Sequence, residues 1–178
     1  IKKRRREVSI IVDAMKDGSI PLRVTHNDTK LNNVMIDIKT GEGVCVIDLD
    51  TVMPGSLLYD YGDALRYGAS SGSEDETDLS KIWFDMNLFK YFTKGYFHEV
   101  LPILVPKEIE LMAFSVKLMT FECGIRFLTD YLNGDTYFKI HKEKHNLHRA
   151  RTQFKLVSDI EGKMDIMNKI IRELIEVS

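Results

Sequence analysis

Residues 24–37 read VTHNDTKLNNVMID, and residues 46–50 read VIDLD. They overlap two short β-branched runs, Val34–Ile38 and Val44–Ile47, which are separated by a Gly-containing loop at residues 39–43. Two such runs around a short loop predict a β-hairpin. Polar residues crowd the open end of this hairpin, which makes the region the first candidate for chemistry.

Helical patterns occupy most of the remaining chain. The predicted helical stretches are residues 1–17, 60–68, 79–98, about 107–132 and about 144–177. No repeat, low-complexity segment or inter-domain linker interrupts them. Residues 1–178 are therefore interpreted as one mainly helical α+β unit with a small embedded hairpin.

The composition is that of a globular protein with one hydrophobic core, since 44% of the residues are hydrophobic and 29% are charged. Lys plus Arg is 25 and Asp plus Glu is 27, so a net charge of −2 gives no overall attraction to nucleic acid or anionic lipid. No apolar stretch approaches the ~20 residues of a membrane span. The two cysteines, Cys45 and Cys123, form no CxxC motif, and a reducing cytoplasm is the expected compartment.

Three polar residues before the hairpin follow an informative spacing. His26 and Asp28 are followed by Asn33, five residues beyond the aspartate. This H-x-D-x-x-x-x-N spacing is typical of the catalytic loop of kinases. The alternative is that these are ordinary polar loop residues, with Asp48 and Asp50 merely closing a strand.

The predicted hairpin gives a geometric argument for a metal site. If the loop is centred between residues 40 and 41, Asn33 lies opposite Asp48, with ~5 Å between the Cβ atoms. An amide oxygen and a carboxylate from neighbouring strands suit Mg²⁺. Asp50 shares the side-chain parity of Asp48 and is either a second ligand or a turn residue. Asp28 would face the same point and accept, or orient, the proton of a substrate hydroxyl.

Four stretches carry a resemblance to a known family: RVTHNDTKLNNVMID at 23–37, VCVIDLDTVMPGSLLYDYGDALR at 44–66, GIRFLTDYLNGDTYFKI at 124–140 and HNLHRARTQFKLV at 145–157. They resemble the aminoglycoside phosphotransferase/choline kinase-like family of small-molecule kinases, and within it the N-acetylhexosamine 1-kinases. The resemblance implies ATP- and Mg²⁺-dependent phosphorylation of the anomeric hydroxyl of GlcNAc or GalNAc. It also implies that the chain is the C-terminal, catalytic lobe of a protein-kinase-like fold.

The resemblance further assigns roles to individual residues. Asp28 would be the base, His26 would brace the loop, and Asn33 and Asp48 would hold Mg²⁺ and the nucleotide phosphates. Arg126 and Tyr137 match sugar-contacting positions, and Tyr67 matches an aromatic position near the sugar. The alternatives are an i,i+4 pair with Glu122 for Arg126 and plain core packing for the two tyrosines.

The chain has neither a Gly-rich phosphate loop nor a lysine in a Val-Ala-Ile-Lys-like strand. The resemblance places both in an N-terminal lobe preceding residue 1. We therefore expect this chain alone to be inactive and to require that lobe as its partner. The rival interpretations are a kinase of another small alcohol (an aminoglycoside, choline or homoserine) and a non-catalytic kinase-like binding module.

Two further groups of polar residues receive structural interpretations. Asp60 and Asp63 are predicted to be the N-cap and N3 acids of the helix over 60–68, and the resemblance assigns the bracing of the catalytic loop to Asp63. His141, His145 and His148 have helical spacing but neighbour Lys142, Lys144 and Arg149. A surface facing solvent or substrate is therefore favoured over a zinc site.

Overall fold

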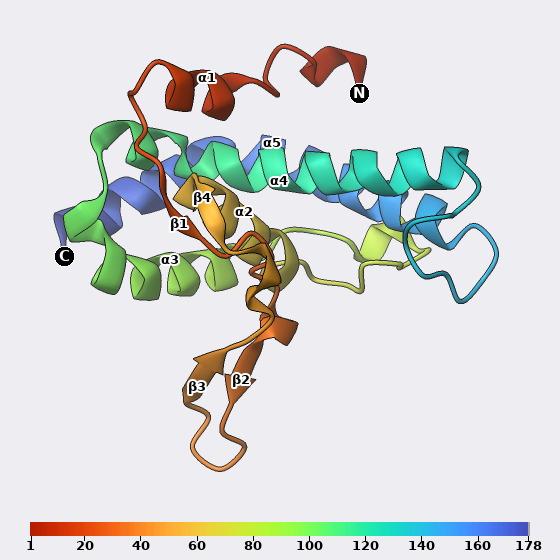
Figure 1. Ribbon diagram of the computed structural model, residues 1–178, viewed down its shortest axis with the longest axis horizontal. Helices are drawn as coiled ribbons and strands as arrows, with labels where there is room; N and C mark the ends of the chain where they lie inside the picture. Colours follow the sequence, from red (N-terminus) through yellow and green to blue (C-terminus); the bar gives the residue numbers. More distant parts are fainter. Residues whose placement is uncertain (178) are drawn as a thin grey trace.

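Two long antiparallel helices, α4 and α5, form the frame of the molecule (Figure 1). The computed structural model describes residues 1–177. Its helices are α1 (Ile10–Lys16), α2 (Leu57–Gly68), α3 (Met86–Val100), α4 (Pro106–Leu132) and α5 (His145–Glu176). Its strands are β1 (Arg23–Thr25), β2 (Val34–Ile36), β3 (Gly43–Val46) and β4 (Met53–Gly55). Short 3₁₀ turns occupy Lys2–Arg4, Leu31–Asn33, Leu49–Thr51, Leu79–Lys81 and Leu101–Ile103.

The hydrophobic core lies where α2, α4 and α5 meet. Each helix buries an apolar stripe, with Met112 and Val116 of α4 and Leu156 of α5 fully enclosed. Gly62 permits the closest approach, because a Cβ there would lie 2.6 Å from the carbonyl oxygen of Ser115. This close packing fixes α2 against α4, and α2 in turn supports the polar loop that begins at residue 26.

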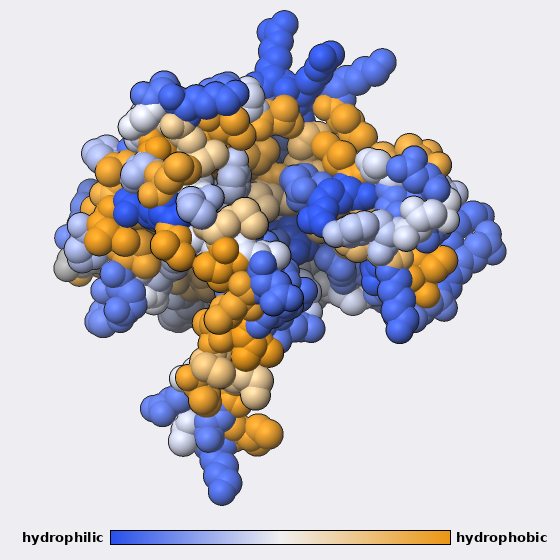
Figure 2. Space-filling model, in the orientation of Figure 1, coloured by the Kyte–Doolittle hydropathy of each residue, from blue (hydrophilic) through white to orange (hydrophobic). Residues whose placement is uncertain are grey.

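Two small antiparallel sheets flank that loop. β1 pairs with β4, with Val24 opposite Pro54, and β2 pairs with β3, with Val34 opposite Val46. The β2–β3 hairpin projects from the helical body (Figure 1), and every residue of both its strands is exposed. Figure 2 shows the resulting apolar surface on the hairpin. Its most exposed large side chains include Met35 (51%) and Val44 (65%).

The predicted fold class is confirmed: the chain is mainly helical, with a small hairpin, as in the C-terminal lobe of a kinase-like fold. The predictions for α4 and α5 agree with the structure within one residue at each end. Residues 1–17 form a 3₁₀ turn and α1 rather than one helix, and α3 begins seven residues after the predicted start at 79. α2 begins at Leu57, three residues before the predicted start. The β1–β4 sheet was not predicted.

Over residues 1–177, none of the helices combines the length and the apolar character that a membrane crossing requires.

Candidate active site

The loop after β1 is held in place by a carboxylate of α2. Oδ2 and Oδ1 of Asp60 accept the backbone N–H groups of His26 and Asn27, both at 2.7 Å. Asn27 adopts a left-handed backbone conformation (φ 64°), which asparagine tolerates better than most residues. The assignment of this bracing role to Asp63 is therefore wrong, because Asp63 pairs with Arg66 of its own helix at 2.8 Å.

The predicted capping roles of these two aspartates are also wrong. The N-cap of α2 is Ser56, whose hydroxyl accepts the N–H of Leu58. Because α2 begins at Leu57, Asp60 lies inside the helix, and its side chain contacts the loop at His26 and Asn27 instead of capping the helix. The helix also fixes the loop through its backbone, since the hydroxyl of Thr29 donates to the carbonyl oxygen of Asp60 at 2.7 Å.

His26 connects the loop to the end of the hairpin. Its Nδ1 accepts the backbone N–H of Asp28 at 3.2 Å, and its Nε2 lies 2.9 Å from the carbonyl oxygen of Ile47. A neutral imidazole with the proton on Nε2 satisfies both contacts at once. His26 is thus placed as a brace between the residue before Asp48 and the backbone of Asp28.

The Asp28 carboxylate receives two side-chain donors. Lys30 Nζ lies 2.7 Å from its Oδ2, and Asn33 Nδ2 lies 3.0 Å from the same oxygen and 2.9 Å from the Asp28 carbonyl. Partial burial would raise the pKa of Asp28, but these hydrogen bonds and the charge of Lys30 outweigh it and hold the pKa below its usual range. Asp28 is therefore ionised at neutral pH and able to accept a hydrogen bond from a hydroxyl.

The predicted pairing of Asn33 with Asp48 is wrong by one residue. The pairing of Val34 with Val46 extends to a hydrogen bond from the Ile47 N–H to the Asn33 carbonyl, so Asp48 lies one position beyond. The strands also change register between Met35 and Ile36, so the offset from the predicted pairing differs along the hairpin. Asp48 has a left-handed backbone (φ 62°), which turns the chain at the end of the hairpin.

The residue types predicted to bind a divalent cation lie near the open end of the hairpin, but over residues 1–177 no three His, Cys, Asp or Glu side chains group together as a metal site. Asn33 is buried, and its amide nitrogen is committed to Asp28, which leaves its oxygen available. Asp48 is exposed at the hairpin end, and its charge helps raise the pKa of Lys30, after the larger effect of the hydrogen bond to Asp28. An amide oxygen beside carboxylates is hard-oxygen chemistry that suits Mg²⁺. Asp50 lies in the exposed turn Leu49–Thr51.

A cavity of about 550 Å³, here called the central cavity, opens beside this loop. It brings Asp28 together with Arg126 and Tyr137, which are about 100 residues away in sequence. Its lining comes from the catalytic loop, α2, α4, the segment after α4 and the first turns of α5. The charged lining residues are Asp28, Lys30, Asp63, Arg66, Glu74, Glu122, Arg126, Lys139 and Arg149.

Arg126 and Tyr137 lie next to each other in the lining of this cavity. The guanidinium carbon lies 6.0 Å from the ring centre of Tyr137 and 5.4 Å from that of Phe138. Tyr137 is 74% exposed, so its ring is not a core side chain. The ion pair of Arg126 with Glu122 is also present, at 3.7 Å between Nε and Oε1. It is a half-exposed pair of the weak surface kind, which leaves donors of Arg126 for a ligand.

Tyr67 is not in the central cavity. Its hydroxyl donates to Oδ1 of Asn32 at 3.1 Å, and its ring lines a separate pocket with Ser73 and Gln153. Of the three histidines, His141 and His145 are neighbours, since the backbone N–H of His141 donates to Nδ1 of His145 at 3.2 Å. His145 is buried against Asp75, whereas His141 lines the central cavity.

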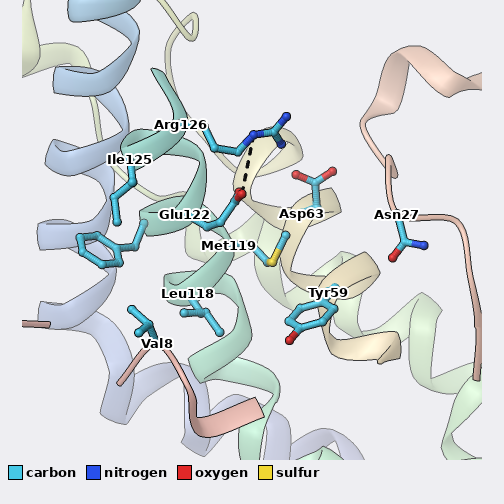
Figure 3. Close-up of a pocket in the computed structure, with 10 residues that line it drawn as sticks. Val8, Asn27, Tyr59, Asp63, Leu118, Met119, Glu122, Ile125 and Arg126 are labelled. Atoms are coloured by element: carbon cyan, nitrogen blue, oxygen red, sulfur yellow. Dashed lines mark ion pairs between the residues drawn. The ribbon is translucent and has the colours of Figure 1, made fainter. Parts of the chain in front are cut away.

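An apolar annex of about 600 Å³ adjoins the central cavity (Figure 3). The two share Asn27, Asp63, Met119, Glu122 and Arg126 as lining residues. Beyond this shared rim the annex is lined by apolar side chains, including Val8, Leu118 and Ile125. Glu122 lies where the polar cavity meets the apolar annex, and burial there raises the pKa of its carboxyl group.

Lys30 is the functional candidate that the sequence interpretation missed. It lines the central cavity, and its ammonium contacts the Asp28 carboxylate. The signal was its position two residues after the aspartate, inside the H-x-D-x-x-x-x-N segment, where a cation can offset the negative charge of a transferring phosphoryl group.

Fold and site together define a class: a kinase-like catalytic lobe in which a carboxylate, a lysine and an amide converge beside a cavity of small-molecule size, as in phosphotransferases that act on small-molecule hydroxyls. The sequence profile of the phosphotransferase enzyme family matches residues 2–91, which is half of the chain. The chain therefore belongs to this family, that of the aminoglycoside phosphotransferases and choline kinase-like enzymes. Members generally use ATP with Mg²⁺.

Proposed function

We propose that the protein transfers the γ-phosphoryl group of ATP to the anomeric hydroxyl of an N-acetylhexosamine, GlcNAc or GalNAc, to give the sugar 1-phosphate. The observation that carries the proposal is the shared cavity of Asp28, Arg126 and Tyr137. It offers an ionised carboxylate for a hydroxyl at one side and a hydrogen-bonding cation with an exposed aromatic ring at the other.

The lining chemistry fits each part of such a sugar. Arg126 has donors for ring hydroxyls or for an acetamido oxygen. The exposed ring of Tyr137 suits an apolar sugar face. The annex next to Arg126 provides apolar surface for the acetamido methyl group.

The alternative acceptors fit less well. A choline headgroup needs an aromatic cage, but the positive charge of Arg126 beside Tyr137 and Phe138 repels a cationic headgroup. An aminoglycoside is polycationic and needs unpaired carboxylates, but Asp63 is engaged by Arg66. The cavity lining also carries the cations Lys30, Arg126, Lys139 and Arg149. A neutral polyhydroxyl acceptor is therefore favoured.

In this proposal the acceptor hydroxyl donates its hydrogen bond to the Asp28 carboxylate, which orients the oxygen and takes the proton as the new bond forms. The positive charge of Lys30 offsets the negative charge of the transferring group. His26 and Asp60 keep the loop in position. Asn33 and Asp48, with Asp50 as a further ligand, are the residues proposed to hold Mg²⁺. When bound, the ion would neutralise phosphate charge.

We further propose that an N-terminal lobe completes the nucleotide site and that this chain alone is inactive. The support is the hairpin, whose strands expose apolar side chains on both faces beside Asn33 and Asp48. A surface of this kind is normally covered. The proposed compartment remains the cytoplasm.

The test is a phosphorylation assay on the full-length enzyme, with ³¹P NMR of the product to identify a sugar 1-phosphate. Asp28→Asn is expected to abolish turnover while sugar binding, measured by calorimetry, stays within about threefold. The variant keeps the size of the side chain and loses its negative charge. Undiminished turnover would refute the assignment of Asp28, and a product phosphorylated at another hydroxyl would refute the anomeric specificity.

A further inference from the structure

The segment that carries Tyr137 has no regular secondary structure, yet a single buried carboxylate organises it. Asp130, in the last turn of α4, is 5% exposed. Its Oδ1 accepts the backbone N–H groups of Thr136 at 3.0 Å and Tyr137 at 2.8 Å. Its Oδ2 accepts that of Phe138 at 2.9 Å. Three consecutive amides of one loop therefore point at one side chain.

A second set of contacts closes the arrangement. Asn146, buried at the start of α5, donates from its amide nitrogen to Asp130 at 2.9 Å and to Asp135 at 2.8 Å. The turn itself contains left-handed residues at Gly134 (φ 91°) and Asp135 (φ 57°), which bend the chain back toward α4. Burial alone would raise the pKa of Asp130. The hydrogen bonds from the three backbone N–H groups outweigh this effect and lower the pKa, so the carboxylate is charged.

The loop fixed in this way forms one wall of the central cavity. The ring of Phe138 packs on buried Phe127, with 4.7 Å between ring centres, and Tyr137 stands edge-on to Phe138 at 4.8 Å. Arg126 lies over the exposed ring of Tyr137 and the half-buried ring of Phe138. Asp130 itself is absent from the lining of that cavity and faces the backbone of the loop.

We propose that Asp130 is a positioning residue for acceptor specificity: it holds residues 136–138 in the one conformation that presents Tyr137, and through it Arg126, to the acceptor. The inference rests on the proposed function, because it takes this wall as the acceptor side of the site. In this proposal Asp130 itself contacts neither the acceptor nor ATP. A preorganised loop lowers the entropy cost of binding, so loosening it weakens acceptor binding more than it slows chemistry.

The test is Asp130→Asn in the full-length enzyme. The amide nitrogen of asparagine replaces one of the two acceptor oxygens, so that two of the four hydrogen bonds are lost whichever way the side chain is turned. We expect the KM for the acceptor to rise on the order of tenfold. The kcat and the KM for ATP should each change less than about threefold, since Asp28 and Lys30 lie on a different loop.

Asp135→Asn is the matched control. It makes the same chemical change in the same loop, but Asp135 accepts only the side chain of Asn146, and asparagine tolerates the left-handed backbone. Its acceptor KM should stay within about twofold of the wild-type value. Amide hydrogen exchange supplies a second readout, because the N–H groups of residues 136–138 should exchange faster in Asp130→Asn and remain protected in the control.

The outcomes separate this inference from the proposed function. An unchanged acceptor KM in Asp130→Asn, or an equal fall in kcat and rise in the KM for ATP, overturns the positioning role while sugar phosphorylation stands. If the wild-type enzyme phosphorylates a different alcohol, the proposed function fails, and the same KM comparison with that alcohol decides the role of Asp130. An enzyme that phosphorylates no acceptor overturns both.

Discussion

Replacing Lys30 with methionine isolates the electrostatic support of the candidate base. The Nζ of Lys30 lies 2.7 Å from Oδ2 of Asp28, and methionine keeps most of the aliphatic stem without the charge. The burial of Asp28, which raises its pKa, remains in the variant, as does the hydrogen bond from Asn33, which lowers it. Removal of the cation must therefore shift the pKa of Asp28 upward.

The strength of the attraction between Lys30 and Asp28 follows from the distance between their charges. Two unit charges 2.7 Å apart attract each other by about 1.5 kcal/mol in bulk water and about 6 kcal/mol at an effective dielectric constant of 20. The side chains of Lys30 and Asp28 are 37% and 30% exposed, so solvent screening favours the lower value. Loss of this attraction destabilises the ionised form of Asp28 by about 1.5 kcal/mol, and we therefore expect the pKa of Asp28 to rise.

Carbon-13 NMR titration of the aspartate carboxyl groups measures this pKa directly and requires no turnover. Lys39→Met removes an exposed charge from the hairpin loop and serves as the control, in which the pKa of Asp28 should stay unchanged. If the pKa of Asp28 fails to rise in Lys30→Met, the ion pair does not stabilise the ionised form, and the reasoning about the base is refuted.

The same ion pair makes a pH-dependent contribution to stability. The pKa of Asp28 is lower in the folded protein than in the unfolded chain, so its ionisation stabilises the fold above the ordinary carboxyl pKa. This stabilisation is lost as the pH falls through the depressed pKa. The free energies of unfolding of wild type and Lys30→Met should therefore differ by at most about 1 kcal/mol at neutral pH and converge once the pH falls below the depressed pKa of Asp28.

Two other substitutions test the remaining parts of the catalytic loop. Asp48→Asn should weaken Mg²⁺ binding by about tenfold, measured by titration calorimetry with the metal alone, because a carboxylate ligand is lost; equal affinity would exclude Asp48 as a ligand. Asp60→Asn should lower the free energy of unfolding by about 2 kcal/mol in urea denaturation and accelerate amide exchange at His26 and Asn27. A variant with unchanged exchange at these two amides would contradict the bracing role.

The long helices were predictable because their apolar periodicity persists over many turns, as in α4 and α5. The β1–β4 sheet was not, because its strands have three residues each and pair across about 30 positions, with Pro54 inside one of them. Such pairing depends on tertiary packing, which local patterns do not contain. The start of α2 was misjudged because the two aspartates were preferred over Ser56 as the cap.

The register of the hairpin could not be predicted from the sequence for a different reason. Its existence followed from the two β-branched runs, but its register depended on the geometry of the loop. The loop closes earlier than predicted: the Asp37 N–H donates to the carbonyl oxygen of Glu42 and the Gly41 N–H to that of Asp37, and Ile47 rather than Asp48 lies opposite Asn33. Side-chain alternation could not have revealed this, because both faces of the hairpin are apolar and exposed, so either register leaves similar surface.

The two halves of the candidate site lie in different parts of the sequence, and only one of them falls within the region that matches the family profile. The residues assigned to phosphoryl transfer lie between His26 and Asp48, inside the region that matches the family profile. Arg126 and Tyr137 lie outside it, on α4 and on the loop that Asp130 organises. Family membership therefore establishes the general type of reaction, whereas the proposed choice of acceptor rests on residues in the second half of the chain. Variants at Arg126, Asp130 and Tyr137 should accordingly alter acceptor preference, and variants at Asp28 and Asp48 should alter the rate with every acceptor.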